Sequence, residues 1–212
     1  MLTDQLSSEA LGVLLHAAGV TGPHRSRPWR LEVDGHLVDA YLDADGMPAP
    51  IARADRIATG AALFNLRCAA ASLSFETWLS LYPYPENPGL AARVVVEPTG
   101  LPDQELRKLY RAILSRHLVR PPRCPDVNAR FALERAAELE GAHLHWLPGT
   151  TRPVALVGTD LDEPADPLRT GMALQRVLLT ALANDVPATR LQQTLIQFGE
   201  AFDVDEHRSK AS

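Results

Sequence analysis

Two groups of basic residues in this sequence have types and spacing that could do chemistry. The first group is Arg116, His117 and Arg120, which fall at the end of an expected helix with one helical turn between the two arginines. Guanidinium groups bind phosphate and other anions through paired hydrogen bonds, so this cluster could hold an anionic ligand. The alternative is a solvated basic turn, because cations near a helix C-terminus interact favourably with the helix dipole.

The second group lies in an expected loop and consists of Arg25, Arg27 and Arg30. An arginine there could bind a phosphate-bearing ligand, since its guanidinium donates hydrogen bonds but accepts none. The alternative is that all three are ordinary loop arginines. We expect the adjoining Pro28 and Trp29 to be structural, as a rigid exit from the loop and an anchor in the core.

Other candidate residues give weaker signals. His143 and His145 lie on one face of an expected strand, but no third metal ligand is near them in sequence, which favours a surface role. The acidic residues from Asp160 to Asp166 lack the spacing of an EF-hand, which favours a solvated loop over a calcium site. We expect Cys68 to be a small core residue and Trp78 to pack at a strand end.

We expect a helix over 168–184 to lie at the centre of the fold that positions these residues. Its apolar residues wrap most of the way round a 3.6-residue period, which is typical of a buried central helix. Part of this helix has a second copy, because residues 59–63 and 170–174 share the pattern Thr-Gly-x-Ala-Leu. The segments before the two copies also look alike, since 14–29 contains a helix end, a turn and a tryptophan, and 131–146 contains a helix, a glycine and a tryptophan.

These paired matches predict that the chain, 1–212, is one domain made of two related halves, at about 1–97 and 105–200. Two equivalent helices, at about 56–74 and 168–184, should then pack face to face. Residues 200–212 are polar and should form a frayed tail.

The remaining periodicity predicts an α+β fold. Asp34 and Gly35 mark the turn of a hairpin over 29–42, and Gly141 marks the end of a helix. We further expect helices at about 7–18, 103–117 and 127–140, strands at about 77–82, 91–97, 143–147 and 154–158, and a proline-rich loop at 47–54.

Composition narrows the functional class. The chain is 46% hydrophobic and 22% charged, which is ordinary for a soluble globular protein. A net charge of −5 and the lack of a Lys/Arg run argue against nucleic acid as a partner. No apolar stretch approaches the roughly 18 residues of a membrane span. Two cysteines without a CxxC motif and no signal peptide predict a reduced, cytoplasmic protein.

The loop at 24–30 resembles a motif of a known family. It reads His-Arg-Ser-Arg-Pro-Trp-Arg and is similar to the His-Asn-x-Gln-Pro-Trp-Arg loop of the FMN-binding nitroreductase superfamily, especially its actinobacterial Acg-type branch. Residues 60–63 resemble the Gly-Ala-x-Leu helix of that branch, and residues 116–120 resemble its Arg-Arg-Thr-x-Arg motif. With a closing helix that resembles residues 173–183, the series spans roughly residues 8–190.

The resemblance implies how FMN would bind. The basic cluster would hold the phosphate and reach the ring, the loop would meet the pyrimidine edge, and a later residue would lie near the reactive nitrogen. NAD(P)H is the implied electron donor, and the flavin would carry the hydride. The implied contacts are Arg116, His117 and Arg120, then Arg25, Ser26 and Arg27, and finally Thr189.

The sequence departs from the family at several positions. The Asn and Gln of the family loop correspond to Arg25 and Arg27, and a Ser/Thr of the later motif corresponds to Leu118. The family's Gly-Leu-Gly/Ala turn after the second central helix is also replaced. Here Pro187 lacks an N–H and Asp185 adds negative charge where reduced flavin would be anionic. These departures weaken the case for hydride chemistry.

Two hypotheses of function follow. The first is an FMN-binding protein of the nitroreductase family, either an NAD(P)H-dependent oxidoreductase or a flavin-sequestering relative. The alternative is a flavin-free, degenerate relative that acts as an interaction or structural subunit. The resemblance implies a mixed, mainly antiparallel sheet flanked by helices. Because ordinary members are homodimers with FMN at the subunit interface, the duplication predicts a monomer that mimics a dimer, or a homodimer of such chains.

Overall fold

The structure, a computed structural model, has helices packed on one side of an antiparallel sheet, so the expected α+β class is confirmed. None of the described helices is long and apolar enough to cross a membrane. The structure describes residues 6–20, 27–42, 47–115, 125–147, 154–161 and 163–186.

The first part of the chain forms a helix, a hairpin and a second, longer helix. Helix α1 spans Ser8–Gly19. The hairpin pairs β1 (Trp29–Asp34) with β2 (Leu37–Leu42) and turns at Gly35, whose φ of 61° suits glycine. Helix α2 spans Ala49–Ser72. The hairpin and its turn are therefore confirmed.

Helix α2 begins earlier than the sequence pattern indicated. We predicted a loop at 47–54, but the helix already begins at Ala49, so the loop prediction is wrong over most of this range. Prolines misled the prediction. Pro48 is the N-terminal cap of α2, and Pro50 lies in its first turn. The N–H groups at these positions form no hydrogen bond within a helix, so a proline, which lacks the N–H, is tolerated there.

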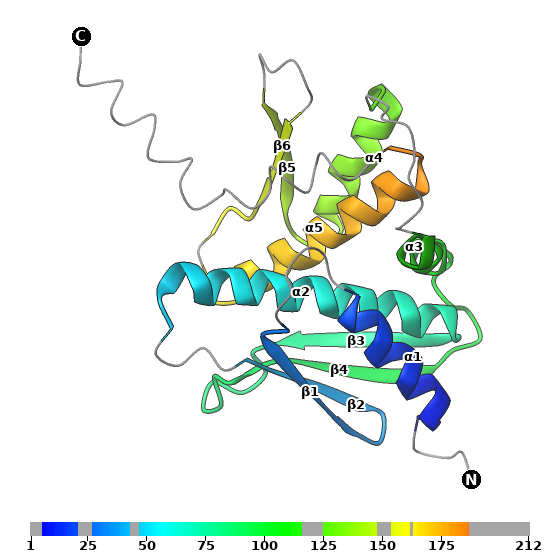
Figure 1. Ribbon diagram of the computed structural model, residues 1–212, viewed down its shortest axis with the longest axis vertical. Coiled ribbons are helices and arrows are strands. Elements are labelled where there is room, and N and C mark those ends of the chain that lie inside the picture. Colours follow the sequence, from blue (N-terminus) through cyan, green and yellow to red (C-terminus); the bar gives the residue numbers. More distant parts are fainter. Residues whose placement is uncertain are drawn as a thin grey trace.

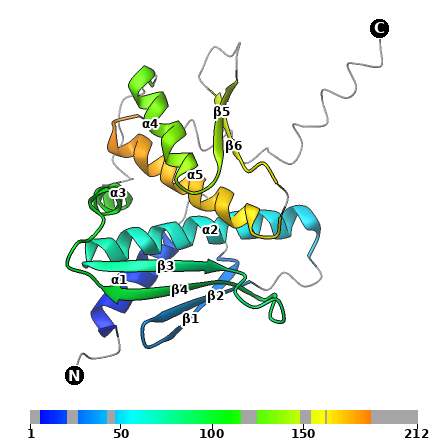
Figure 2. The ribbon, with the colours of Figure 1, turned by 180° about the vertical axis from the view of Figure 1, so that it is seen from behind.

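Two further strands complete a four-stranded antiparallel sheet. Strands β3 (Phe75–Leu81) and β4 (Leu90–Pro98) extend the hairpin in the order β1-β2-β4-β3. The alternate residues that face α1 and α2 are the buried ones, as Ala40 and Val94 show. Figures 1 and 2 show the helices on one face of this sheet, while no described helix or strand covers its other face, called the open face below.

The second part of the chain repeats the order helix, hairpin, helix. After α3 (Gln104–Ser115) come α4 (Val127–Glu138), the antiparallel hairpin β5 (His143–Leu147) and β6 (Val154–Gly158), and helix α5 (Asp166–Ala183). Helix α4 packs on α5 as α1 packs on α2. The two parts therefore share an order of elements, and their relation by duplication stays a prediction.

Helices α2 and α5 cross each other (Figure 1), and one glycine from each helix lies at the contact. A Cβ on Gly60 would lie 2.0 Å from the backbone oxygen of Leu168, and a Cβ on Gly171 would lie 2.0 Å from that of Ile57. In both cases the oxygen belongs to the residue three positions before the opposite glycine, so the contact is reciprocal. The prediction that these helices pack face to face is confirmed.

Candidate functional site

Arg27 is the one predicted ligand contact that the structure describes. It is exposed, and its guanidinium lies against Gly19 at the end of α1, where Nη2 is 2.7 Å from the position of a Cβ. Arg27 therefore places a charged group between the end of α1 and the start of β1. The other predicted contacts, Arg25, Ser26, Arg116, His117, Arg120 and Thr189, lie outside the described residues.

Val20, the residue that follows α1, is hydrogen-bonded to the helical core. The side-chain amide of Asn65, fully buried in α2, donates a hydrogen bond to the carbonyl of Val20 at 2.9 Å. Gln175 of α5 donates in turn to the side-chain oxygen of Asn65 at 2.8 Å. These hydrogen bonds join Val20, at the end of α1, to α2 and α5.

Helix α3, which leads toward the second basic group, is also anchored at its start. The carboxylate of Asp103 accepts hydrogen bonds from the N–H groups of Glu105 and Leu106, at 2.8 and 3.0 Å, as an N-cap. Arg176 of α5 donates to Glu105 at 2.7 Å. These contacts fix the direction of α3 up to its last residue, Ser115.

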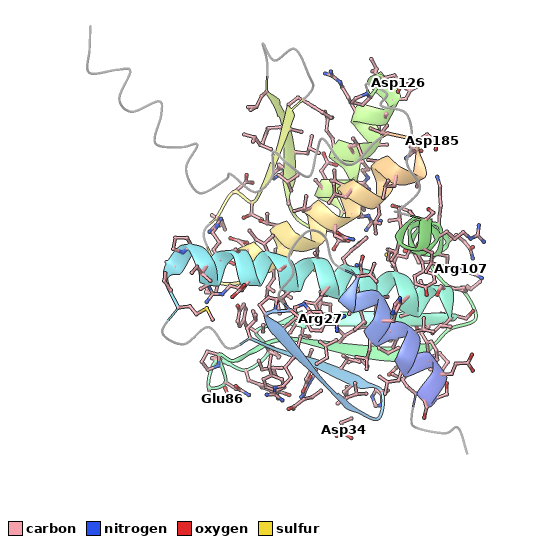
Figure 3. All side chains as sticks on the ribbon, in the orientation of Figure 1. Arg27, Asp34, Glu86, Arg107, Asp126 and Asp185 are labelled. Carbon is pink, nitrogen blue, oxygen red and sulfur yellow. The ribbon has the colours of Figure 1, made fainter. Side chains whose placement is uncertain are left out.

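Arg27 and the end of α5 lie in different parts of the described structure. Figure 3 shows Arg27 beside α1 and β1, whereas Asp185 lies at the far end of α5. Asp185 adopts a φ of 56°, and the N–H of Val186 returns to the carbonyl of Ala181 at 2.8 Å, which closes the helix end. The end of α5 therefore belongs to a different region of the molecule from Arg27.

A cluster of charges that was not predicted from the sequence lies where α2, α5, α3 and the end of α4 meet. Glu140 accepts hydrogen bonds from Arg67 at 2.6 Å and from Arg176 at 2.8 Å, and its side chain is only 4% exposed. Arg176 also reaches Glu105. Both guanidiniums lie over the ring of Phe64, at 5.6 and 5.7 Å from its centre.

The charges of this cluster are matched to one another. Burial by itself would lower the pKa of Arg176, but its hydrogen bonds to Glu105 and Glu140 outweigh burial and raise it. Burial raises the pKa of the neighbouring Cys68 thiol, and the nearby guanidiniums offset only part of that effect. Cys68 is thus a neutral core residue, as predicted, and is not set up as a nucleophile.

One sequence signal could have revealed the cluster. Arg176 interrupts a helix that is apolar on nearly all sides, and a charged residue in such a helix must find a buried partner. The sequence does not indicate which residue that partner is, because Glu140 is distant in sequence and follows an ordinary surface helix.

The weaker metal candidates do not assemble. His143 and His145 share a strand face as expected, but the partner of His143 is Asp160, at 3.1 Å. Within the described residues no group of three His, Cys, Asp or Glu could hold a metal ion. The predicted solvated acidic loop is wrong for Asp166, which is buried at the start of α5 and accepts from Glu163 N–H and Arg169.

Comparison with known proteins adds no identification. No protein-family model matches the sequence, and no curated protein matches it.

Proposed function

We propose that this chain is an FMN-binding protein of the nitroreductase type, in which a single chain takes the place of a two-subunit arrangement. The reciprocal crossing of α2 and α5 at Gly60 and Gly171 carries the proposal. Each helix belongs to a helix–hairpin–helix unit, as a duplicated subunit would require. The loop motif that resembles the family follows the first helix of the first unit.

The proposed contacts are cationic. Arg116, His117 and Arg120 would hold the phosphate, and Arg25, Ser26 and Arg27 would donate to the pyrimidine edge. Arg27 is an exposed residue, which suits such a donor. Thr189 would lie near the reactive nitrogen. Bound FMN would supply hydride chemistry with NAD(P)H as donor.

The first test is the visible absorbance spectrum of the purified protein, recorded as isolated and again after FMN is added and the sample desalted. A flavin band that stays with the protein supports the proposal. Arg116→Ala combined with Arg120→Ala should then release the flavin, because the phosphate loses both guanidiniums. The matched control is Arg130→Ala with Arg135→Ala, which removes two exposed arginines from α4. Stoichiometric FMN in the Arg116/Arg120 variant would refute the phosphate site.

The second candidate function is a flavin-free relative that acts as an interaction or structural subunit. One observation favours it. Arg67 and Arg176, the two cations of the charge cluster between α2 and α5, are both bound to carboxylates of the chain. This cluster therefore offers no spare cation to a phosphate. A folded protein with no flavin band before or after FMN addition would support this second function and exclude the first.

A further inference from the structure

The open face of the four-stranded sheet carries an apolar row. Trp78 in β3 lies opposite Val95 in β4, and Val95 lies opposite Leu37 in β2. Trp78 is 49% exposed in the middle of its strand, so the prediction that it packs at a strand end is wrong. Exposed aromatic residues surrounded by apolar neighbours are typical anchors of protein interfaces.

Carboxylates border this row on one side. Glu76 and Glu97 are exposed cross-strand partners in β3 and β4, and the described residues give neither of them an ion pair. Like charges directly opposite one another destabilise a sheet. On the other side of the row charge is balanced, because Arg93 pairs with Asp39 at 2.6 Å. The sheet face thus has an apolar centre and excess negative charge along one border.

Helix α3 presents the complementary surface on another side of the molecule. Arg107 and Arg111 lie one turn apart on its outer side, and Figure 3 shows Arg107 directed away from α2. Leu114 is 53% exposed beside them. Lys108 adds another exposed cation, whereas Glu105, the carboxylate of this helix, is bound to Arg176. The outer side of α3 is therefore basic, with an apolar residue at its end.

We propose that the open sheet face of one copy of this chain docks against the outer side of α3 of a second copy. Leu114 would pack on Trp78, and Arg107 and Arg111 would meet Glu76 and Glu97. The ion pairs would determine how the two surfaces are oriented against each other. The apolar residues at the centre of the contact would bury most of the apolar area. The two surfaces differ and lie on different elements, so the contact is heterologous and can add copies head to tail.

The test is sedimentation velocity over a range of protein concentrations, at about 0.05 M and about 0.5 M salt. We expect association at low salt that weakens at high salt. Glu76→Lys with Glu97→Lys, and separately Arg107→Glu with Arg111→Glu, should each weaken association by about tenfold or more. A mixture of the two variants should associate again, because every reversed surface then meets its complement.

The control reverses two other exposed arginines, Arg130→Glu with Arg135→Glu on α4, and should associate like the unaltered protein. Circular dichroism establishes that each variant is folded. Three results would overturn the proposal: a monomer at every concentration, association that neither double variant weakens, or a mixture that stays monomeric. Stronger self-association of the Glu76/Glu97 variant would also overturn it, since these carboxylates would then protect the strand edge instead.

Discussion

Helices α2 and α5 meet in two regions that follow different rules. At Gly60 and Gly171 the backbones touch, and no side chain separates them. Further along, Glu140 holds Arg67 and Arg176 in a buried charge cluster. The first region is reciprocal between the two helices, whereas the second depends on a carboxylate from outside them.

The difference teaches what each region tolerates. A crossing of backbones fails when an atom is added, because close-packed helices have no space for a new methyl group. A buried ion cluster fails when an atom group is removed, because the remaining charges stay buried without a partner. Substitutions that remove one carboxylate or add one methyl group therefore separate the two contributions to the stability of this interface.

The largest effect should come from Glu140→Ala. Removing this carboxylate leaves Arg67 and Arg176 without their shared partner, and breaking a buried pair typically costs about 3–5 kcal/mol of unfolding free energy. Urea unfolding followed by circular dichroism measures the loss.

Glu138→Ala is the matched control, because Glu138 lies two residues away and forms a solvent-exposed ion pair with Arg135. Exposed pairs contribute roughly 0–1 kcal/mol. Equal losses in the Glu140 and Glu138 variants would mean that the buried cluster does not hold the helices together.

The next effect is that of Gly171→Ala. The new Cβ would lie 2.0 Å from the backbone oxygen of Ile57, so α2 and α5 must move apart, at a cost of about 2–3 kcal/mol. Gly12→Ala tests the same change in an open position of α1, where nothing lies within 4 Å of the new Cβ. It should stabilise the protein by roughly 0.5–1 kcal/mol, since alanine favours a helix over glycine. A neutral Gly171→Ala would show that the crossing is loosely packed.

The two regions also differ in how far the sequence predicts them. The packing of α2 on α5 could be predicted from the sequence. The repeated Thr-Gly-x-Ala-Leu pattern contains both glycines, and the apolar periodicity indicates both helices. The hairpin turn at Gly35 could also be predicted from the sequence, since local spacing determines it. Local pattern therefore predicted most elements, apart from the start of α2 after Pro48.

The charge cluster could not be predicted from the sequence, because its four residues come from separate parts of the chain and no local spacing links them. They are Arg67, Glu105, Glu140 and Arg176. The exposure of Trp78 was missed for a related reason. Strand alternation places it opposite the core face of β3, but whether another layer covers that face depends on the complete arrangement of elements. Resemblance to a family motif named the basic residues and left their distances from one another unspecified.

The smallest effect should come from Glu105→Gln, which removes only the outer arm of the charge cluster. Glu105 is 52% exposed, and water screens its pairing with Arg176, so the loss should be about 0.5–1 kcal/mol. In a chain of this size that shifts the melting temperature by about 1–4 °C, and high salt should reduce the difference. Arg176 keeps Glu140, and α3 keeps the buried contacts of Leu106 and Leu109. A loss as large as that of Glu140→Ala would instead mean that the ion pair, and not the apolar side of α3, holds this helix on α5.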